Sequence, residues 1–176
     1  MNDQKLRRIA LAAMFTALTT VATLLIRIST VAGYTNLGDG IVLLGGIFLG
    51  PGLGFAAGGL GSAMADLLAG YAYYIPGTFL IKGGCASIAV LILNRIWKRE
   101  KSPSVWQMVL STLPAELFMA AGYFLYKALI LGKPESAAAS IPNNLAQGAV
   151  GMIVCTLLFC LLYKITEIRK RVWKGR

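Results

Sequence analysis

Residues 62–84 read SAMADLLAGYAYYIPGTFLIKGG, and the two charges in this stretch limit the folds open to the chain. Asp66 and Lys82 each lie in a run that is otherwise apolar. A charged side chain at the centre of a lipid bilayer costs about 2.5–3.5 kcal/mol, so such residues normally face the interior of a helix bundle. The stretch therefore predicts two membrane helices, joined by a turn at residues 71–75, that keep a carboxylate and an ammonium group away from lipid.

The composition extends this interpretation to the whole chain. Of the 176 residues, 57% are apolar and only 14% are charged, whereas a soluble domain carries about 25% charged residues. The 20 glycines also fit, because glycine is more frequent in membrane helices than in soluble ones. The sequence contains neither a long linker nor a low-complexity tract, and its length suits one domain. We therefore expect a polytopic membrane protein.

Six stretches are apolar enough to be membrane helices, which need about 20 residues each to cross a bilayer. The motif LGPGLG at 49–54 divides a run too long for one span, because proline removes a backbone donor and glycine permits a turn. Pro142 suits the first turn of a helix and is expected to open the last span. We predict an all-α fold that forms one six-helix domain over residues 1–176, with spans at 6–28, 38–50, 53–70, 76–97, 105–131 and 142–163.

The positive charge is distributed as in a membrane protein. The net charge is +10, and basic residues gather at residues 5–8, 95–101 and 164–176, each time beside an apolar segment. Cytoplasmic loops carry such an excess under the positive-inside rule. Clusters on one side of the membrane must be separated by an even number of spans, and six spans with both termini in the cytoplasm satisfy this condition. We expect the clusters to contact anionic lipid, not nucleic acid.

The sequence lacks the residue patterns of catalysis and metal binding. It has no histidine, and its three cysteines, Cys85, Cys155 and Cys160, form no CxxC pair. Zinc sites of the usual kind and Cys–His nucleophiles are therefore not expected. Neither a GxxxxGK[ST] phosphate-binding loop nor a GxSxG or HExxH motif occurs. We predict no catalytic residue, no metal, no cofactor and no enzymatic activity.

The polar residues of the predicted spans fall at similar depths. With alternating helix directions, polar groups from five spans lie in the outer half of the bundle: Asp39, Asp66, Lys82, Glu116, Asn143, Asn144 and Gln147. Residues three or four apart, such as Asn143 and Asn144 with Gln147, share one helix face. Apolar walls with a few converging polar groups are the usual form of a small-molecule pocket. We therefore predict a ligand pocket that opens to the outside.

Simpler interpretations remain open for parts of this set. Asp66 and Lys82 can form a structural ion pair, and Glu116 can hydrogen-bond a neighbouring helix without contacting a ligand. The tyrosines at 71–74 are more typical of a belt at the membrane interface than of a ligand platform. Small residues recur every four positions through 54–70, and this pattern predicts close packing against another helix.

Several stretches together resemble one transporter family. They are NLGD at 36–39, GPGLGFAAGGLGSAMADLLAGY at 50–71, PGTFLIKG at 76–83, ELFMAAGYFLY at 116–126 and IPNNLAQGAVG at 141–151. These motifs resemble the S components of energy-coupling factor (ECF) vitamin transporters, and in particular the group classed with the riboflavin-type S components. That group includes members assigned to pyridoxine or hydroxymethylpyrimidine.

The resemblance implies a fold, a location and a set of partners. S components have six membrane helices, lie in the plasma membrane of prokaryotic cells, and bind a vitamin at the outer face. By this resemblance residues 34–38, in the loop joining the first two spans, would cover the site. A transmembrane coupling protein and two ATPase subunits complete the transporter. Ala13 and Ala17, four apart in the first span, resemble the alanine motif by which S components dock onto the coupling protein.

The candidate site combines the polar residues with this resemblance. Lysine donates hydrogen bonds, carboxylates accept them, and side-chain amides do both, so a small hydroxylated heteroaromatic compound would use all of them. We favour a pyridoxine- or hydroxymethylpyrimidine-like ligand; the alternative is riboflavin, for whose three rings no obvious set of extra aromatic residues is visible. An alternative from another class is a small structural or assembly membrane protein without a ligand. The predicted substrate contacts are Tyr34, Asn36, Asp39, Asp66, Lys82, Glu116, Tyr123, Asn144 and Gln147.

Overall fold

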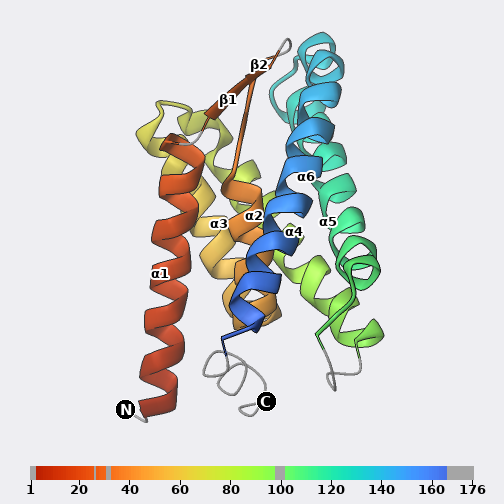
Figure 1. Cartoon of the computed structure of the whole chain (residues 1–176). Helices are drawn as coiled ribbons and strands as arrows, with labels where there is room; N and C mark the ends of the chain where they lie inside the picture. Colours follow the sequence, from red (N-terminus) through yellow and green to blue (C-terminus); the bar gives the residue numbers. More distant parts are fainter. Residues whose placement is uncertain (1–2, 26, 31–32, 98–101, 166–176) are drawn as a thin grey trace.

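The computed structural model describes residues 3–25, 27–30, 33–97 and 102–165 of the chain. Within these ranges the chain forms six α-helices and one two-stranded hairpin (Figure 1). A 3₁₀ turn, Ala72–Tyr74, precedes the fourth helix, and a π-helical turn, Tyr126–Ile130, follows the fifth. The elements are α1 (Asp3–Leu25), β1 (Arg27–Thr30), β2 (Gly33–Asn36), α2 (Gly38–Leu49), α3 (Pro51–Leu68), α4 (Ile75–Ile96), α5 (Val105–Leu125) and α6 (Pro134–Tyr163).

The prediction of six membrane helices is confirmed, and four helical segments are long and apolar enough to cross a membrane. These segments are Asp3–Leu25, Ala72–Ile96, Val105–Ile130 and Pro134–Tyr163. α2 is also apolar but has only 12 residues. It packs against α1, α3, α4 and α6, and most of its residues are buried. α2 is therefore the enclosed helix at the centre of the bundle.

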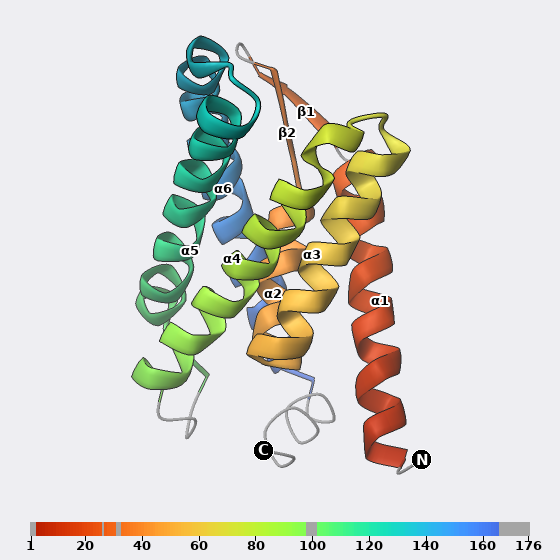
Figure 2. The same ribbon diagram turned by 180° about the vertical axis from the view of Figure 1, so that it is seen from behind.

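The bundle has two distinct ends. The start of α1 and the end of α6 lie at one end, and the β-hairpin crosses the other (Figure 1). The two strands are antiparallel, with Arg27 opposite Asn36 and Thr30 opposite Gly33. Figure 2, seen from behind, shows α3 and α4 passing in front of α2. The segment predicted as a loop over residues 34–38 is thus the second strand of a hairpin and the start of α2.

Small residues bring α2, α3 and α4 into direct backbone contact. A Cβ atom added to Gly46 of α2 would lie 2.3 Å from the carbonyl oxygen of Ala86 on α4, and one added to Gly54 of α3 would lie 2.6 Å from the Cα of Gly46. Gly50 has a φ of 86°, which favours glycine, and Pro51 occupies the first turn of α3. The predicted division between the second and third spans and the close packing of the third are both confirmed.

The prediction that Pro142 opens the last helix is wrong. α6 begins at Pro134, which lies in its first turn, and Pro142 lies inside the helix. The residues between the two prolines are mostly alanine and serine, and alanine is the strongest helix former. Prolines are also tolerated within membrane helices, because neighbouring groups satisfy the freed backbone. Asn143, Asn144 and Gln147 consequently lie well inside α6 and not in its first turn.

A continuous apolar cluster fills the half of the bundle nearer the chain ends. Its fully buried members include Leu43 of α2, Leu93 of α4, Met108 of α5 and Phe159 of α6, each at most 1% exposed. The ring of Trp97 meets that of Phe159 edge to face, with centroids 6.1 Å apart. This cluster closes the end of the bundle opposite the hairpin.

Candidate functional site

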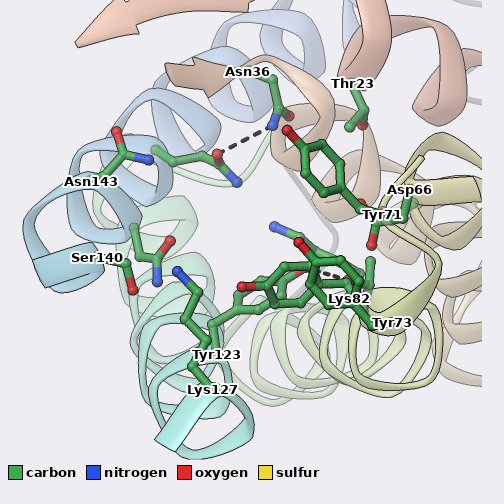
Figure 3. Close-up of a pocket in the computed structure, with 15 residues that line it drawn as sticks. Thr23, Asn36, Asp66, Tyr71, Tyr73, Lys82, Tyr123, Lys127, Ser140 and Asn143 are labelled. Atoms are coloured by element: carbon green, nitrogen blue, oxygen red, sulfur yellow. Dashed lines mark hydrogen bonds between the residues drawn. The ribbon is translucent and has the colours of Figure 1, made fainter. Parts of the chain in front are cut away.

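A pocket of about 340 Å³ lies at the hairpin end of the bundle (Figure 3). This volume is within the range of about 300–1,000 Å³ that is usual for small-molecule sites. Its wall draws on α1, β2, α3, α4, α5 and α6 and on the two short turns, so the whole hairpin end of the bundle contributes. The lining residues are Thr23, Asn36, Ser62, Asp66, Tyr71, Tyr73, Tyr74, Thr78, Lys82, Tyr123, Lys127, Ser140, Asn143, Asn144 and Gln147.

The floor of the pocket is a chain of hydrogen bonds between four elements. Lys82 of α4 forms a buried ion pair with one carboxylate oxygen of Asp39 on α2. The other oxygen of Asp39 accepts a hydrogen bond of 2.8 Å from Nε2 of Gln147 on α6. Oε1 of Gln147 accepts a bond of 3.2 Å from Nδ2 of Asn36 at the end of β2. All four side chains are buried, and the bonds between them offset the loss of water that burial imposes.

The structural ion pair between Asp66 and Lys82, one of the simpler interpretations, is not formed. The amino group of Lys82 turns to Asp39 and lies 5.4 Å from the centre of the Tyr123 ring. Asp66 lines a different part of the wall, and its Oδ2 is buried without a hydrogen-bond partner among the described residues. Nδ2 of Asn144 is in the same situation. One acceptor and one donor in the wall are thus available to a ligand or to water.

Glu116 and Asp39 lie beneath the pocket wall, not in it. Glu116 is 5% exposed, and its Oε2 has no hydrogen-bond partner among the described residues. A Cβ added to Gly148 would lie 2.9 Å from the Cβ of Glu116, and one added to Gly151 would lie 2.7 Å from the Cβ of Asp39. Two glycines of α6 therefore provide the space for both carboxylates. No three His, Cys, Asp or Glu side chains in the described ranges are placed to hold a metal ion.

A wall of tyrosines forms one side of the pocket. Tyr71, Tyr73 and Tyr74, for which an interfacial belt was the favoured interpretation, line the pocket together with Tyr123. Tyr74 is the centre of the group, since its ring centroid lies 4.8 Å from that of Tyr73 and 6.4 Å from that of Tyr123. The hydroxyl of Tyr126 donates to the carbonyl of Tyr73 at 2.8 Å and fixes the turn. The clustering of YAYY at 71–74, two residues before Pro76, is the sequence signal for this wall.

The structure thus sorts the predicted substrate contacts into three groups. The first group lines the pocket, the second lies behind the lining side chains, and the third consists of Tyr34, which belongs to β2 but whose side chain is outside what the structure describes. Direct contact with a ligand stays a prediction for all of them. The first group is Asn36, Asp66, Lys82, Tyr123, Asn144 and Gln147, and the second is Asp39 and Glu116.

A separate apolar groove runs between α1 and α3. Thr20 of α1 donates a hydrogen bond of 2.8 Å to the carbonyl of Gly61 on α3 and ties the two helices together. Ala13 and Ala17 are exposed on the groove, and small residues of this kind allow another membrane helix to come close. Docking of a partner on them stays a prediction. The groove is lined by Ile9, Ala12, Ala13, Thr16, Ala17, Thr20, Val21, Ala56, Ala57, Leu60 and Met64.

The fold and the sequence define a class, namely the multi-pass membrane proteins that serve as components of transporters. The family model described as the S component of ECF-type riboflavin transporters matches residues 3–164. The chain belongs to this family. It is therefore a cell-membrane protein of vitamin uptake and not an enzyme.

Two further similarities accompany the family match. An uncharacterized protein of Pyrococcus woesei, from the gap 3′ region, is 34% identical over 137 residues, which cover 77% of this chain and 87% of that protein. A solved structure of the S component of a bacterial ECF transporter superposes with a TM-score of 0.66 and covers 93% of this chain and 99% of its own. The sequences of these two chains are 19% identical, so this second similarity shows that the fold is shared.

Proposed function

We propose that this chain is the substrate-binding subunit of an ECF transporter and that it captures riboflavin in the pocket at the hairpin end. The observation that carries this proposal is the wall of tyrosines above a polar, hydrogen-bonded floor. The family match supports riboflavin ahead of the pyridoxine- or hydroxymethylpyrimidine-like ligand that the sequence favours. The small structural or assembly protein without a ligand, the alternative from another class, does not account for a pocket of this size and polarity.

The chemistry of riboflavin suits the side chains around the pocket. The objection drawn from the sequence was a shortage of aromatic residues for a fused three-ring system. Tyr71, Tyr73, Tyr74 and Tyr123 remove this objection because they line a single pocket, and aromatic faces stack well on planar rings. The ring carbonyls and the ribityl hydroxyls of a flavin offer acceptors and donors for the polar remainder of the wall, including the unpartnered groups of Asp66 and Asn144.

The orientation and the partners complete the proposal. The basic residues at 5–8 in the first turns of α1 and Arg95 in the last turn of α4 lie at the end of the bundle opposite the hairpin, and the positive-inside rule assigns that end to the cytoplasm. The pocket then faces the outside. A transmembrane coupling protein would dock along the groove that contains Ala13 and Ala17, and two ATPase subunits would drive uptake.

The proposal is tested by titrating the purified protein in detergent with riboflavin and following flavin fluorescence. Stacking on tyrosine is expected to quench this fluorescence in a saturable manner. Asp66→Asn is expected to weaken binding about tenfold, since a hydrogen bond to a charged group contributes roughly 1.5–3 kcal/mol. Ser87→Ala, which removes a half-buried hydroxyl that donates to the Pro51 carbonyl and lies outside the pocket, serves as the matched control with unchanged affinity.

Pyridoxine, tested in the same assay by competition, separates the two candidate vitamins. Displacement of riboflavin only at a large excess of pyridoxine supports the proposal. Saturable binding of pyridoxine without binding of riboflavin would show that the vitamin is wrong while the role as a binding subunit stands. If neither compound binds, the proposal that this pocket captures one of these vitamins is wrong.

A further inference from the structure

Gln147 lines the pocket, but the protein itself already engages both ends of its side-chain amide. Oε1 accepts from Asn36, and Nε2 donates to Asp39 at 2.8 Å and lies 3.9 Å from Sδ of Met119. From this we infer that Gln147 is a positioning residue that latches the β-hairpin onto the floor of the pocket. The latch itself is independent of the ligand, and its effect on ligand release rests on the proposed function.

The polarity of the latch is fixed by its two ends. The backbone N–H of Gly38 can only donate, and it bonds to Oδ1 of Asn36 at 2.9 Å. The carboxylate of Asp39, which is ion-paired with Lys82, only accepts. Between these ends each amide can face one way only, with Nδ2 of Asn36 toward Oε1 of Gln147 and Nε2 of Gln147 toward Asp39. A change of orientation in either amide breaks two bonds at once.

Asn36 is the residue through which the hairpin joins the bundle. It is the last residue of β2 and is only 8% exposed. The missing side chain of Gly38 makes room for it, because a Cβ there would lie 2.8 Å from Oδ1 of Asn36 and 2.1 Å from Oγ1 of Thr23. Figure 3 shows Asn36 at the edge of the cavity, with its hydrogen bond directed toward α6. The hairpin is thus held at its base by a bond to α6 that forms part of the pocket floor.

The latch also connects the hairpin to a side chain that a ligand can reach. Lys82 lines the pocket and holds Asp39, which in turn holds Gln147. Hydrogen bonds in such a buried chain strengthen one another. A ligand that accepts a hydrogen bond from the amino group of Lys82 therefore changes the position of the hairpin through Asp39 and Gln147.

Hydrogen exchange of the unliganded protein tests the latch directly. Asn36→Asp keeps the acceptor for Gly38 but removes the donor to Gln147, and Gln147→Leu removes both bonds of Gln147 at similar volume. Each variant is expected to raise the exchange rate of the amides of residues 33–36 about tenfold, which corresponds to about 1.4 kcal/mol and lies within the range of one buried hydrogen bond. Exchange in α4 and α5 should stay unchanged. Thr156→Val, which removes the bond of the Thr156 hydroxyl to Met152 lower on α6, is the control and should leave the hairpin unaffected.

The double variant Asn36→Asp/Gln147→Leu identifies a shared bond. If the two residues act through one latch, the double variant exchanges at the hairpin no faster than the faster single variant. Riboflavin should likewise dissociate about tenfold faster from each single variant, with no further increase in the double variant.

Three outcomes would decide against parts of this proposal. Rate increases that multiply in the double variant, or unchanged hairpin exchange in Asn36→Asp, would overturn the latch. Loss of riboflavin binding in Gln147→Leu with normal hairpin exchange would make Gln147 a ligand contact instead. A wild-type protein that binds no riboflavin would defeat the proposed function, while the exchange result would still decide on the latch.

Discussion

The ion pair of Lys82 and Asp39 sets the electrostatic character of the pocket. Because the two charges neutralise each other in the floor, the charges left facing the cavity from the described residues are the carboxylate of Asp66 and the amino group of Lys127. Figure 3 shows these two side chains on different sides of the cavity. The amino group of Lys127 lies 5.9 Å from the centre of the Tyr74 ring. A neutral ligand with a donor on one side and an acceptor on the other fits this arrangement, and riboflavin is neutral.

Removing one partner of the ion pair should destabilise the protein more than removing both partners. Lys82→Met leaves the buried Asp39 carboxylate without its counter-charge and should lower the free energy of unfolding by about 3–5 kcal/mol. The double variant Lys82→Met/Asp39→Asn should be more stable than Lys82→Met alone, because no buried charge is left uncompensated. Thermal unfolding in detergent measures both. Additive losses in the double variant would show that the two residues act separately.

At the residue scale, the sequence predicts which side chains meet but not how they bond. Polar side chains in apolar runs must face the interior, and together with alternating helix directions this rule brings Asp66, Lys82 and Asn144 to one end of the bundle. The partner of Lys82 depends on the rotation of α2 against α4, which no single helix pattern encodes. The tyrosines at 71–74 also look alike in a membrane belt and in a pocket wall, because both environments are half apolar and half polar.

At the element scale, the contact of α2 with α4 depends on glycine. Gly46→Ala would place a methyl group 2.3 Å from the backbone oxygen of Ala86, and a backbone atom cannot move aside as a side chain can. We expect a loss of about 1–3 kcal/mol or more in the free energy of unfolding. Gly52→Ala, in the first turn of α3 with nothing within 4 Å of the added atom, is the matched control. It should be neutral or stabilise the protein by about 0.5–1 kcal/mol.

Chemical denaturation of the two glycine variants in detergent micelles provides the measurement. Equal stability of Gly46→Ala and Gly52→Ala would contradict the backbone contact between α2 and α4. A destabilised Gly46→Ala that recovers on Ala86→Gly would not be expected, because the obstructing atom belongs to the backbone and remains in place.

Element type is predicted well here, and element boundaries are predicted less well. Apolar runs and the glycine-proline break separate the six helices correctly. The start of α6 is missed because Pro134 and Pro142 are equally suited to a first turn, and only packing decides which of them is used. The hairpin over residues 27–36 is missed because its strands have four residues each, too few for a periodic pattern to stand out from a loop.

At the scale of the whole molecule, the proposed docking of a partner in the groove between α1 and α3 predicts that ligand binding and uptake can be impaired separately. Ala17→Leu fills the groove at an exposed position and should abolish uptake of riboflavin by cells that supply the coupling and ATPase subunits. The purified variant should still bind riboflavin normally, because the groove shares no lining residue with the pocket. Ala121→Leu, at an exposed position on α5, is the control and should preserve both properties. Normal uptake in Ala17→Leu would assign the partner to another surface.

The buried apolar cluster around Leu43, Met108 and Phe159 has a consequence for the path of the cargo. Tightly packed side chains occupy the bundle from the ion pair to the end opposite the hairpin. The pocket is therefore closed at its inner end, and no continuous channel runs through the described part of the bundle. Under the proposed function, a ligand that enters at the hairpin end is therefore expected to leave by the same opening. If the proposed capture takes place at the hairpin end, import requires that this opening itself reach the cell interior, and we expect a change in how the whole bundle is oriented in the bilayer.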